Sequence, residues 1–526
     1  MKITLQGFGG TLPKVEPRYL PDQAAVVASK VRLDRGHLEP AREPVTVDTS
    51  GGPVDSFYVS PPDVGVATLF FAAADVDVVS APIATKTLYL TGNAAVPQKY
   101  FAGSFTDLAW PAPVAAPTAT ITAGVIDPNT QQTTYFAYTL LRGDEESAPS
   151  PLSVAIDTSP NQTVSIGGLP VTHPKRIYRS VTSFSGATEL YFVAQVSLPA
   201  ASFSHTLASS PLGEPIPSTD FDVPPSTMLG IIALPNGIMA GFDGREVCFS
   251  EPYIPHAWPE KYRLSTQDKI IGLVSFGTSV AVLTEGTPYI IQGLHPDSMA
   301  MARLESTAPC VAKRGIVDVG YAALFPSTDG LMQISASGVQ NITEGIFTRS
   351  QWQALNPETI VAAQFRGGYA FLHDAGFAYP ALKMISKDTV APSLIDFGNT
   401  YRHLQFEPYS GRLLTLHANG LHVQSIDDDS ALPSDMAWKS KPFRIPSPMP
   451  FGVIYVDAEP PATGTPSFKC YVYADGVNVA AVGMAPNKIE RLATPTTLAS
   501  IWEVQIEGNY TITRVILCGE PDEVFQ

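Results

Sequence analysis

The chain has 526 residues, a net charge of −16, 44% hydrophobic residues and only 16% charged residues. It is too long for a single ordinary domain, and its apolar content excludes wholesale disorder. The acidic charge argues against a protein that reads nucleic-acid sequence, because such a protein needs Lys and Arg to neutralise phosphates. The 48 prolines, together with many Thr, Val and aromatic residues, indicate a loop-rich, mostly β chain, because proline cannot sit inside helices.

Residues 1–50 show no pattern of a packed element, and they are predicted to form an extended N-terminal arm. The first residues, "MKITLQGFGGTLPKVEP", contain no continuous apolar core of signal-peptide length. No stretch of the sequence reaches the ~20 apolar residues that a membrane span requires. We therefore expect a protein made in the cytoplasm that does not insert into a membrane.

Residues 51–111 are predicted to form a first propeller-blade segment, because their order of apolar runs and turns is repeated further along the chain. An apolar run after Gly65 is broken near Asp75. It is followed by residues 88–100, "LYLTGNAAVPQKY", whose pattern of an apolar run, a turn and a final Lys-Tyr is similar to that of residues 247–262, "VCFSEPYIPHAWPEKY". Residues 112–225 interrupt this pattern. Their alternating stretches, such as "TTYFAYTLL" and "ELYFVAQV", predict an inserted immunoglobulin- or fibronectin-like β-sandwich.

Residues 226–435 carry an internal repeat in which each copy has two glycines in turns between apolar runs. The first glycines of the five copies are Gly237, Gly277, Gly320, Gly367 and Gly411. The second glycines are Gly244, Gly286, Gly330, Gly376 and Gly420. Both series keep a spacing of roughly 40–47 residues, which is the length of one propeller blade. The repeat predicts a β-propeller, with a meandering β-sandwich as the alternative.

Residues 436–526 lose the period but keep strand-like runs, including "PSFKCYVYADG" and "ASIWEVQIEG". They are predicted to form a C-terminal β region that either closes the propeller or makes a small sandwich.

The sequence carries no recognisable catalytic motif, and we predict a protein that is not an enzyme and that has no cofactor or metal. The four cysteines are scattered, so neither a zinc site nor a disulfide framework is indicated. The run Asp427–Asp429 is interpreted as a solvated loop, because it lacks the alternating ligand spacing of a calcium site. His417 and His422 flank an Asn-Gly turn, but a third metal ligand is missing. The segment "STDGLMQI" departs from the Asp-box of sialidases and is interpreted as a hairpin turn around Asp329-Gly330.

The N-terminal stretch resembles the start of tail proteins from short-tailed bacteriophages. In those proteins an arm of the pattern P-K-x-x-P-R-x-L-P-D-x-A-A precedes L-x-x-G-x-L-x-P, and these patterns match residues 13–25 and 33–40 here. The segments "DGREVCFSEPYIPHAWP", "CVAKRGIVDVG" and "MAWKSKPFRIPSPMPFG" are also similar to such proteins. The resemblance is to the podovirus-like tail nozzle, or tail tubular protein B-like, family.

This resemblance implies a structural protein of the virion tail that is synthesised in the host cytoplasm. In the family, a propeller-containing subunit forms a six-fold ring below the portal–adaptor complex, encloses the DNA exit channel and docks tail fibres or a tip. Phage DNA would pass through the lumen without sequence recognition. The family has no catalytic residues to carry over. The arm residues expected to act in assembly are Pro13, Lys14, Pro17, Arg18, Leu20, Pro21 and Asp22.

Two other interpretations compete with a nozzle. A carbohydrate-binding or receptor-binding phage tail propeller would need an exposed aromatic platform with converging acids, and an internal virion scaffold outside the tail is the third possibility. For a nozzle, we hypothesise that acidic charge faces the lumen and repels the moving DNA. The basic residues of the arm are candidates for pairing with acidic faces of an adjoining ring, and they are Lys14, Arg18, Lys30, Arg32, Arg35 and Arg42.

Overall fold

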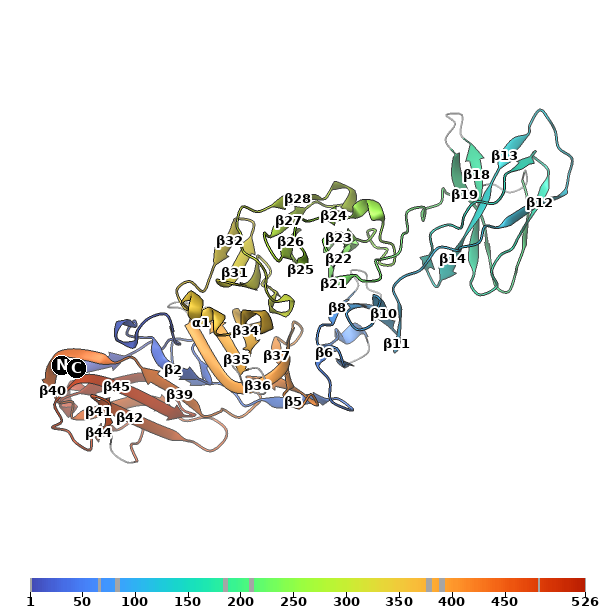
Figure 1. The fold of residues 1–526 in the computed structure, drawn as a ribbon. Helices are drawn as coiled ribbons and strands as arrows, with labels where there is room; N and C mark the ends of the chain where they lie inside the picture. Colours follow the sequence, from blue (N-terminus) through green and yellow to red (C-terminus); the bar gives the residue numbers. More distant parts are fainter. Residues whose placement is uncertain are drawn as a thin grey trace. The chain divides into compact units, whose positions relative to one another are not determined.

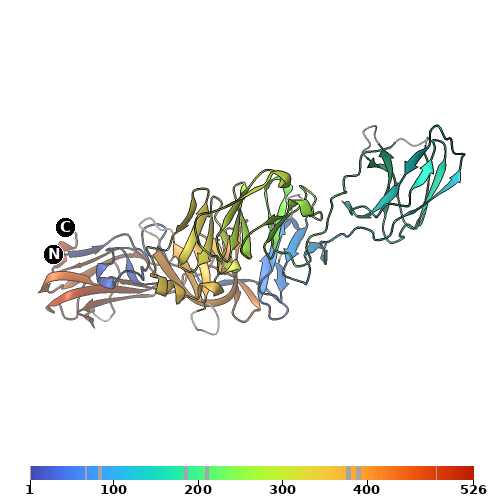
Figure 2. The ribbon, with the colours of Figure 1, turned by 45° about the horizontal axis from the view of Figure 1, so that its top comes forward.

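The structure is a computed structural model that describes residues 2–64, 68–80, 86–182, 188–207, 212–374, 381–386, 393–480 and 483–525. The described chain is mostly β, with short 3₁₀ turns and the helix α1 (Arg349–Gln353) (Figures 1 and 2). It divides into two compact units. The first unit comprises residues 1–76, 268–291 and 301–526, and the second comprises residues 77–267 and 292–300. Gly65 and Gly376, which belong to the predicted repeat, lie outside the described residues.

Several four-stranded sheets each follow the chain from one strand to its neighbour, which is the arrangement of a propeller blade. The fold is therefore a mostly β chain with a β-propeller, as predicted. The first of these sheets contains β8 (Asp77–Ser80), β9 (Leu88–Thr91), β10 (Gln98–Phe101) and β11 (Ser104–Asp107). The next contains β21 (Leu229–Ala233), β22 (Met239–Asp243), β23 (Glu246–Phe249) and β24 (Leu264–Ser265).

Two more four-stranded sheets follow the same rule. One contains β25 (Ile270–Phe276), β26 (Ser279–Thr284), β27 (Tyr289–Gln292) and β28 (Ala300–Arg303). The other contains β29 (Val317–Asp318), β30 (Ala323–Ser327), β31 (Gly330–Ser335) and β32 (Gly338–Asn341). The hairpin predicted around Asp329-Gly330 is the β30–β31 turn, in which Ser327 pairs with Gly330.

The long strand β36 (Ser393–Glu407) belongs to two successive blades. Its first part pairs with β35 (Ala381–Ser386), which continues to β34 (Gly368–His373) and β33 (Val361–Phe365). Its second part pairs with β37 (Arg412–His417), which continues to β38 (His422–Ile426). The outermost strand of this last blade comes from the N-terminal segment, because β5 (Val45–Thr49) pairs with β38. The hairpin of β6 (Ser56–Val59) and β7 (Thr68–Phe71) packs on the same blade through Phe57.

The repeated glycines mark equivalent turns of successive blades. Each first glycine lies between the first and second strands of its blade, and all five have φ between +57° and +87°. This left-handed backbone is strained for other residues, which explains why glycine recurs with the period of the blade. The described second glycines lie at or beside the turn between the second and third strands.

The inserted segment forms a β-sandwich with its own core, as predicted. Phe136, Tyr138, Val164, Ile166 and Ile177 are buried in that core. Its sheets have the orders β12-β17-β20, β13-β16 and β15-β14-β18-β19. The strands are β12 (Thr118–Ala123), β13 (Gln132–Thr134), β14 (Phe136–Arg142), β15 (Glu145–Glu146), β16 (Ile156–Thr158), β17 (Thr163–Gly167), β18 (Lys175–Thr182), β19 (Thr188–Val196) and β20 (Phe203–Thr206).

The C-terminal region forms a second sandwich, so the structure corresponds to the second of the two alternatives that the sequence left open. One sheet has the order β39-β45-β42-β43 with β40 paired to β45, and the other has the order β1-β46-β41-β44. Trp438 and Trp502 are fully buried in the core. The strands are β39 (Met436–Ser440), β40 (Phe443–Met449), β41 (Val453–Glu459), β42 (Phe468–Ala474), β43 (Val477–Asn478), β44 (Ile489–Arg491), β45 (Ala499–Gly508) and β46 (Thr511–Cys518).

The N-terminal arm is extended, but the expectation that it lacks packed elements is wrong. β1 (Lys2–Leu5) pairs with β46, and the two chain ends lie side by side in Figures 1 and 2. β2 (Ala25–Ser29) joins the propeller strand β36 to the sandwich strand β39. β3 (Val31–Arg32) and β4 (Glu39–Pro40) form a small hairpin. β1, β2 and β5 each have five residues or fewer and complete sheets built by distant residues, so no local periodicity in the sequence indicates them.

Candidate functional site

The seven predicted assembly residues lie in the bend of the arm between β1 and β2. One end of this bend is held by the segment that contains α1. Lys14 donates its backbone N–H to the carbonyl of Ile346 (2.8 Å) and its Nζ to the carbonyl of Glu344 (2.5 Å). Gln351 donates its side-chain amide to the carbonyl of Pro13 (2.8 Å).

The other end of the bend is held by the C-terminal sandwich. Lys441 Nζ lies 2.5 Å from the carboxylate of Asp22 and donates a hydrogen bond to the carbonyl of Leu20 (3.0 Å). Between the two ends, residues Pro17–Tyr19 form a 3₁₀ turn in which Tyr19 is 69% exposed. Arg18 pairs with Glu16 (2.7 Å) and stacks over the ring of Tyr19. The exposed bend therefore presents an aromatic ring and a guanidinium at fixed positions.

The segment before the bend is inserted between the propeller and the C-terminal sandwich. Phe8 packs edge-on against Trp438, with ring centroids 5.0 Å apart, and the indole N–H of Trp438 donates to the carbonyl of Gly9 (3.1 Å). A side chain at Gly10 would meet the carbonyl of Leu394 at 2.7 Å, so only glycine fits this close approach. The segment is thus fixed on both sides by its own chain.

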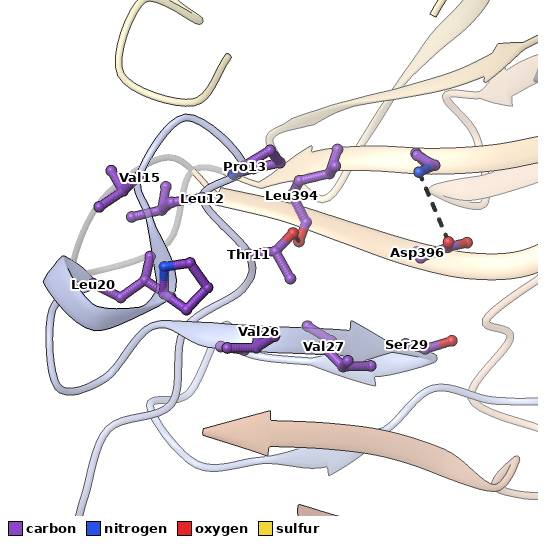
Figure 3. A pocket seen from close by; sticks show the side chains of 14 residues that line it. Thr11, Leu12, Pro13, Val15, Leu20, Val26, Val27, Ser29, Leu394 and Asp396 are labelled. Carbon is purple, nitrogen blue, oxygen red and sulfur yellow. Dashed lines mark hydrogen bonds and ion pairs between the residues drawn. The ribbon is translucent and has the colours of Figure 1, made fainter. Parts of the chain in front are cut away.

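A groove of about 400 Å³ opens beside the bend, and we call it the arm groove (Figure 3). Figure 3 shows Val26 and Val27 of β2 along one side, with Leu12, Pro13 and Leu394 toward the other. Lys383 and Asp396 lie at one end as an ion pair (3.9 Å). Three of the seven predicted assembly residues line the groove, and they are Pro13, Pro17 and Leu20.

Most of the arm's basic side chains have partners inside the chain. Lys30 lies 3.9 Å from Glu43, Arg35 lies 3.6 Å from Glu39, and Arg32 pairs with Asp427. Arg42 contributes its backbone N–H to the Asp427 carboxylate, while its Nε has no hydrogen-bond partner.

The acidic run at residues 427–429 is only in part the solvated loop that the sequence predicted, because its first residue is buried. Asp427 is only 4% exposed, and its carboxylate lies within ion-pair distance of both Arg32 and Arg366. Asp428 instead accepts hydrogen bonds from Ser430, and Asp429 is exposed beside Arg32. The run therefore joins the arm to the last blade, because a buried carboxylate requires such partners.

The other candidate motifs bring no further chemistry together. His417 and His422 have ring centroids 6.5 Å apart on adjacent strands. Among the described residues, no group of three or more His, Cys, Asp or Glu side chains is placed to hold a metal ion. Burial raises the pKa of the Cys248, Cys310 and Cys470 thiols to about 12. No helix among the described residues combines the length and apolar character needed to cross a membrane.

No family model and no curated protein matches the chain. Among solved structures, it is similar to the Neurospora crassa Pan2 WD40 domain at 8% identity and a TM-score of 0.33, over 76% of this chain and 99% of that one. BBS1N in a complex with ARL6DN is 10% identical with a TM-score of 0.27, over 51% of this chain and 96% of that one. The extracellular domain of a putative one component system from B. thetaiotaomicron is 9% identical with a TM-score of 0.25, over 86% of this chain and 42% of that one. These TM-scores and identities are too low to support any conclusion about the chain. The propeller is instead identified from the order of strands in its sheets.

Proposed function

We propose that this chain is a structural subunit of a short-tailed phage tail, a nozzle subunit that joins a six-fold ring below a portal–adaptor complex. The observation that carries the proposal is the arm groove. The pattern through which the arm resembles tail proteins supplies Pro13, Pro17 and Leu20 to its lining. Residues that served local folding alone would not need to line an open groove.

The way the arm is held supports a load-bearing role. Its strands complete both sheets of the C-terminal sandwich and the last blade, so one continuous segment ties these parts together. Ladder hydrogen bonds and the buried Arg32–Asp427 pair oppose separation of these parts. A subunit that lines a DNA channel needs such resistance to distortion.

The partners follow from this role. The groove would contact a neighbouring copy or the adaptor, and tail fibres or a tip would dock elsewhere on the ring. Phage DNA would pass through the lumen without sequence recognition, and the net charge of −16 would disfavour its adhesion.

The experiment is to complement phage particles that lack this protein with variants of the groove. Val27 of β2 is 42% exposed in the groove, and Val47 of β5 is 40% exposed elsewhere on the arm. Val27→Asp should lower the yield of tailed, infectious particles at least tenfold, while Val47→Asp should leave it near the wild-type value. Equal yields from both variants, with both proteins folded, would contradict the proposed role of the groove.

A further inference from the structure

One edge of the inserted sandwich is left open. β12 pairs with β17 along one side, and in the part of the chain that the structure describes no strand or backbone hydrogen bond lies along its other side. Five of its six residues are exposed, and Ile121 is 40% exposed. Its outward N–H and C=O groups are thus available to another strand.

A second edge of the same sandwich is treated differently. Residues 213–216 cover β19 through backbone bonds from Gly213 to Phe192 (2.8 Å), from Phe192 to Glu214 (3.0 Å) and from Ile216 to Leu190 (2.8 Å). Soluble proteins commonly protect free edges with charged side chains, proline, bulges or such coverage. β12 has only one of these devices, a bulge between Ile121 and Ala123.

The open edge also lacks charge, although the chain carries a net charge of −16. Residues 118–126 read "TATITAGVI", without an acidic or basic residue. Val125 (88%) and Ile126 (41%) continue the exposed apolar surface beyond the strand. Two copies can therefore bring these strands together without placing like charges opposite one another.

The order of residues along β12 points to the occupant. The sequence Ala119-Thr120-Ile121-Thr122-Ala123 is a palindrome centred on Ile121. Two copies of the strand, antiparallel and related by a two-fold axis perpendicular to the sheet, keep the same face on the same side. In a register centred on Ile121, isoleucine then lies opposite isoleucine, threonine opposite threonine and alanine opposite alanine, without a mismatched pair.

We propose that two copies of this chain associate through β12, which would join two three-stranded sheets into one sheet of order β20-β17-β12-β12-β17-β20. The contact is isologous, since each copy contributes the same surface. It is independent of the proposed tail function, because neighbours in a six-fold ring meet through two different surfaces.

Charge substitutions at the centre of the register test the pairing. Analytical ultracentrifugation of the full chain should show a concentration-dependent dimer. Ile121→Lys and Ile121→Glu should each weaken it at least about tenfold, because like charges would meet across the axis. A mixture of the two variants should recover association as a heterodimer. Failure of the mixture to associate, or a dimer that survives both substitutions, would overturn the proposal.

A cysteine at the same position tests the register. Directly opposed residues of antiparallel strands have Cα atoms about 4.5–5.5 Å apart, within the range of a disulfide. The four native cysteines are buried, so an introduced thiol would react without competition from them. Ile121→Cys should form a disulfide-linked dimer under mild oxidation, whereas Val154→Cys, 84% exposed elsewhere on the sandwich, should not. Equal cross-linking of both variants would contradict the register, and a hexamer that persists without a 121–121 disulfide would contradict the pairing while leaving the tail proposal standing.

Discussion

Arg32 and Asp427 lie 395 positions apart in the sequence and form a forked ion pair, with Arg32 Nε 2.7 and 2.9 Å from the two carboxylate oxygens. Arg32 also donates from Nη2 to the backbone carbonyl of Asp427 (2.9 Å). The pair is largely buried, with side-chain exposures of 10% and 2%. It adds a buried side-chain link to the strand pairing of β5 with β38, which already joins the arm to the last blade.

Removing the charge of Asp427 should destabilise the first unit. Asp427→Asn leaves Arg32 and Arg366 without their buried partner, and breaking such a pair costs about 3–5 kcal/mol. Asparagine tolerates the φ of +54° at this position, so backbone strain does not confuse the result. Urea unfolding followed by tryptophan fluorescence measures the change. Asp429→Asn, at an 80% exposed carboxylate beside the same arginine, should change the free energy of unfolding by less than about 1 kcal/mol.

Truncation of Phe8 should release the arm from the C-terminal sandwich. Phe8 is 2% exposed against Trp438, and replacing a buried phenylalanine by alanine costs about 3–5 kcal/mol. Limited trypsin digestion should then cut Phe8→Ala faster than wild type at Lys14 and Arg18. Tyr19→Ala, which removes a 69% exposed ring from the same bend, is the control. Identical digestion of Phe8→Ala and wild type would show that Phe8 does not hold the arm.

His403 should make the first unit less stable in acid. Burial lowers the pKa of His403 to about 3, and nearby Arg314 acts in the same direction. In the unfolded chain the histidine pKa is about 6.5, so between the two pKa values this histidine binds a proton in the unfolded state and not in the folded state. The contribution of His403 to the free energy of unfolding is fully present above pH ~6.5. Below that pH it falls by about 1.4 kcal/mol per pH unit until the pH reaches the folded-state pKa.

Unfolding curves at several pH values between 7 and 4.5 check this slope. His403→Phe should reduce the slope by about 1.4 kcal/mol per pH unit, because the substitution removes one titrating group and keeps an aromatic ring beside Phe57. His373, whose pKa burial lowers to about 4, should leave part of the slope in place. Phe57→Leu should lower stability by a similar amount at every pH. An unchanged slope in His403→Phe would mean that other groups cause the acid sensitivity.

Gly277→Ala should cost about 1–2 kcal/mol through the backbone alone. Gly277 has φ +57° in the β25–β26 turn, and a Cβ there would meet no atom within 4 Å. Gly277→Asn should lose less, because asparagine adopts the left-handed conformation more readily. Thermal unfolding of the two variants compares their losses of stability. Equal losses would mean that the positive φ is not the reason for glycine at this position.

The sequence predicted the propeller because glycines recur at turns with the period of the blade, and the first glycine of each blade has a left-handed backbone that few other residues adopt. Examples of these first glycines are Gly277, Gly320 and Gly367, each of which has a positive φ between the first two strands of its blade. The sandwich was predictable from alternation, which is visible in Phe136 and Tyr138 of β14. The turn glycines and the alternation are local patterns, so they can be recognised in a single sequence.

The candidate site was only partly predictable. The arm pattern indicated Pro13, Pro17 and Leu20, but the groove also needs Leu394 and Lys383, which lie on propeller strands far along the chain. Asp427 was misinterpreted because an acidic run normally indicates solvent, and its arginine partners come from the arm and from β33–β34. No local pattern in the sequence indicates a contact that spans nearly 400 positions.

The most direct test of the proposed nozzle role is to count this chain against the portal protein in purified particles by quantitative mass spectrometry. A six-fold ring below a twelve-fold portal predicts about one copy of this chain for every two portal copies. Absence of the chain from mature particles, or a many-fold excess over the portal protein, would contradict the proposed nozzle role.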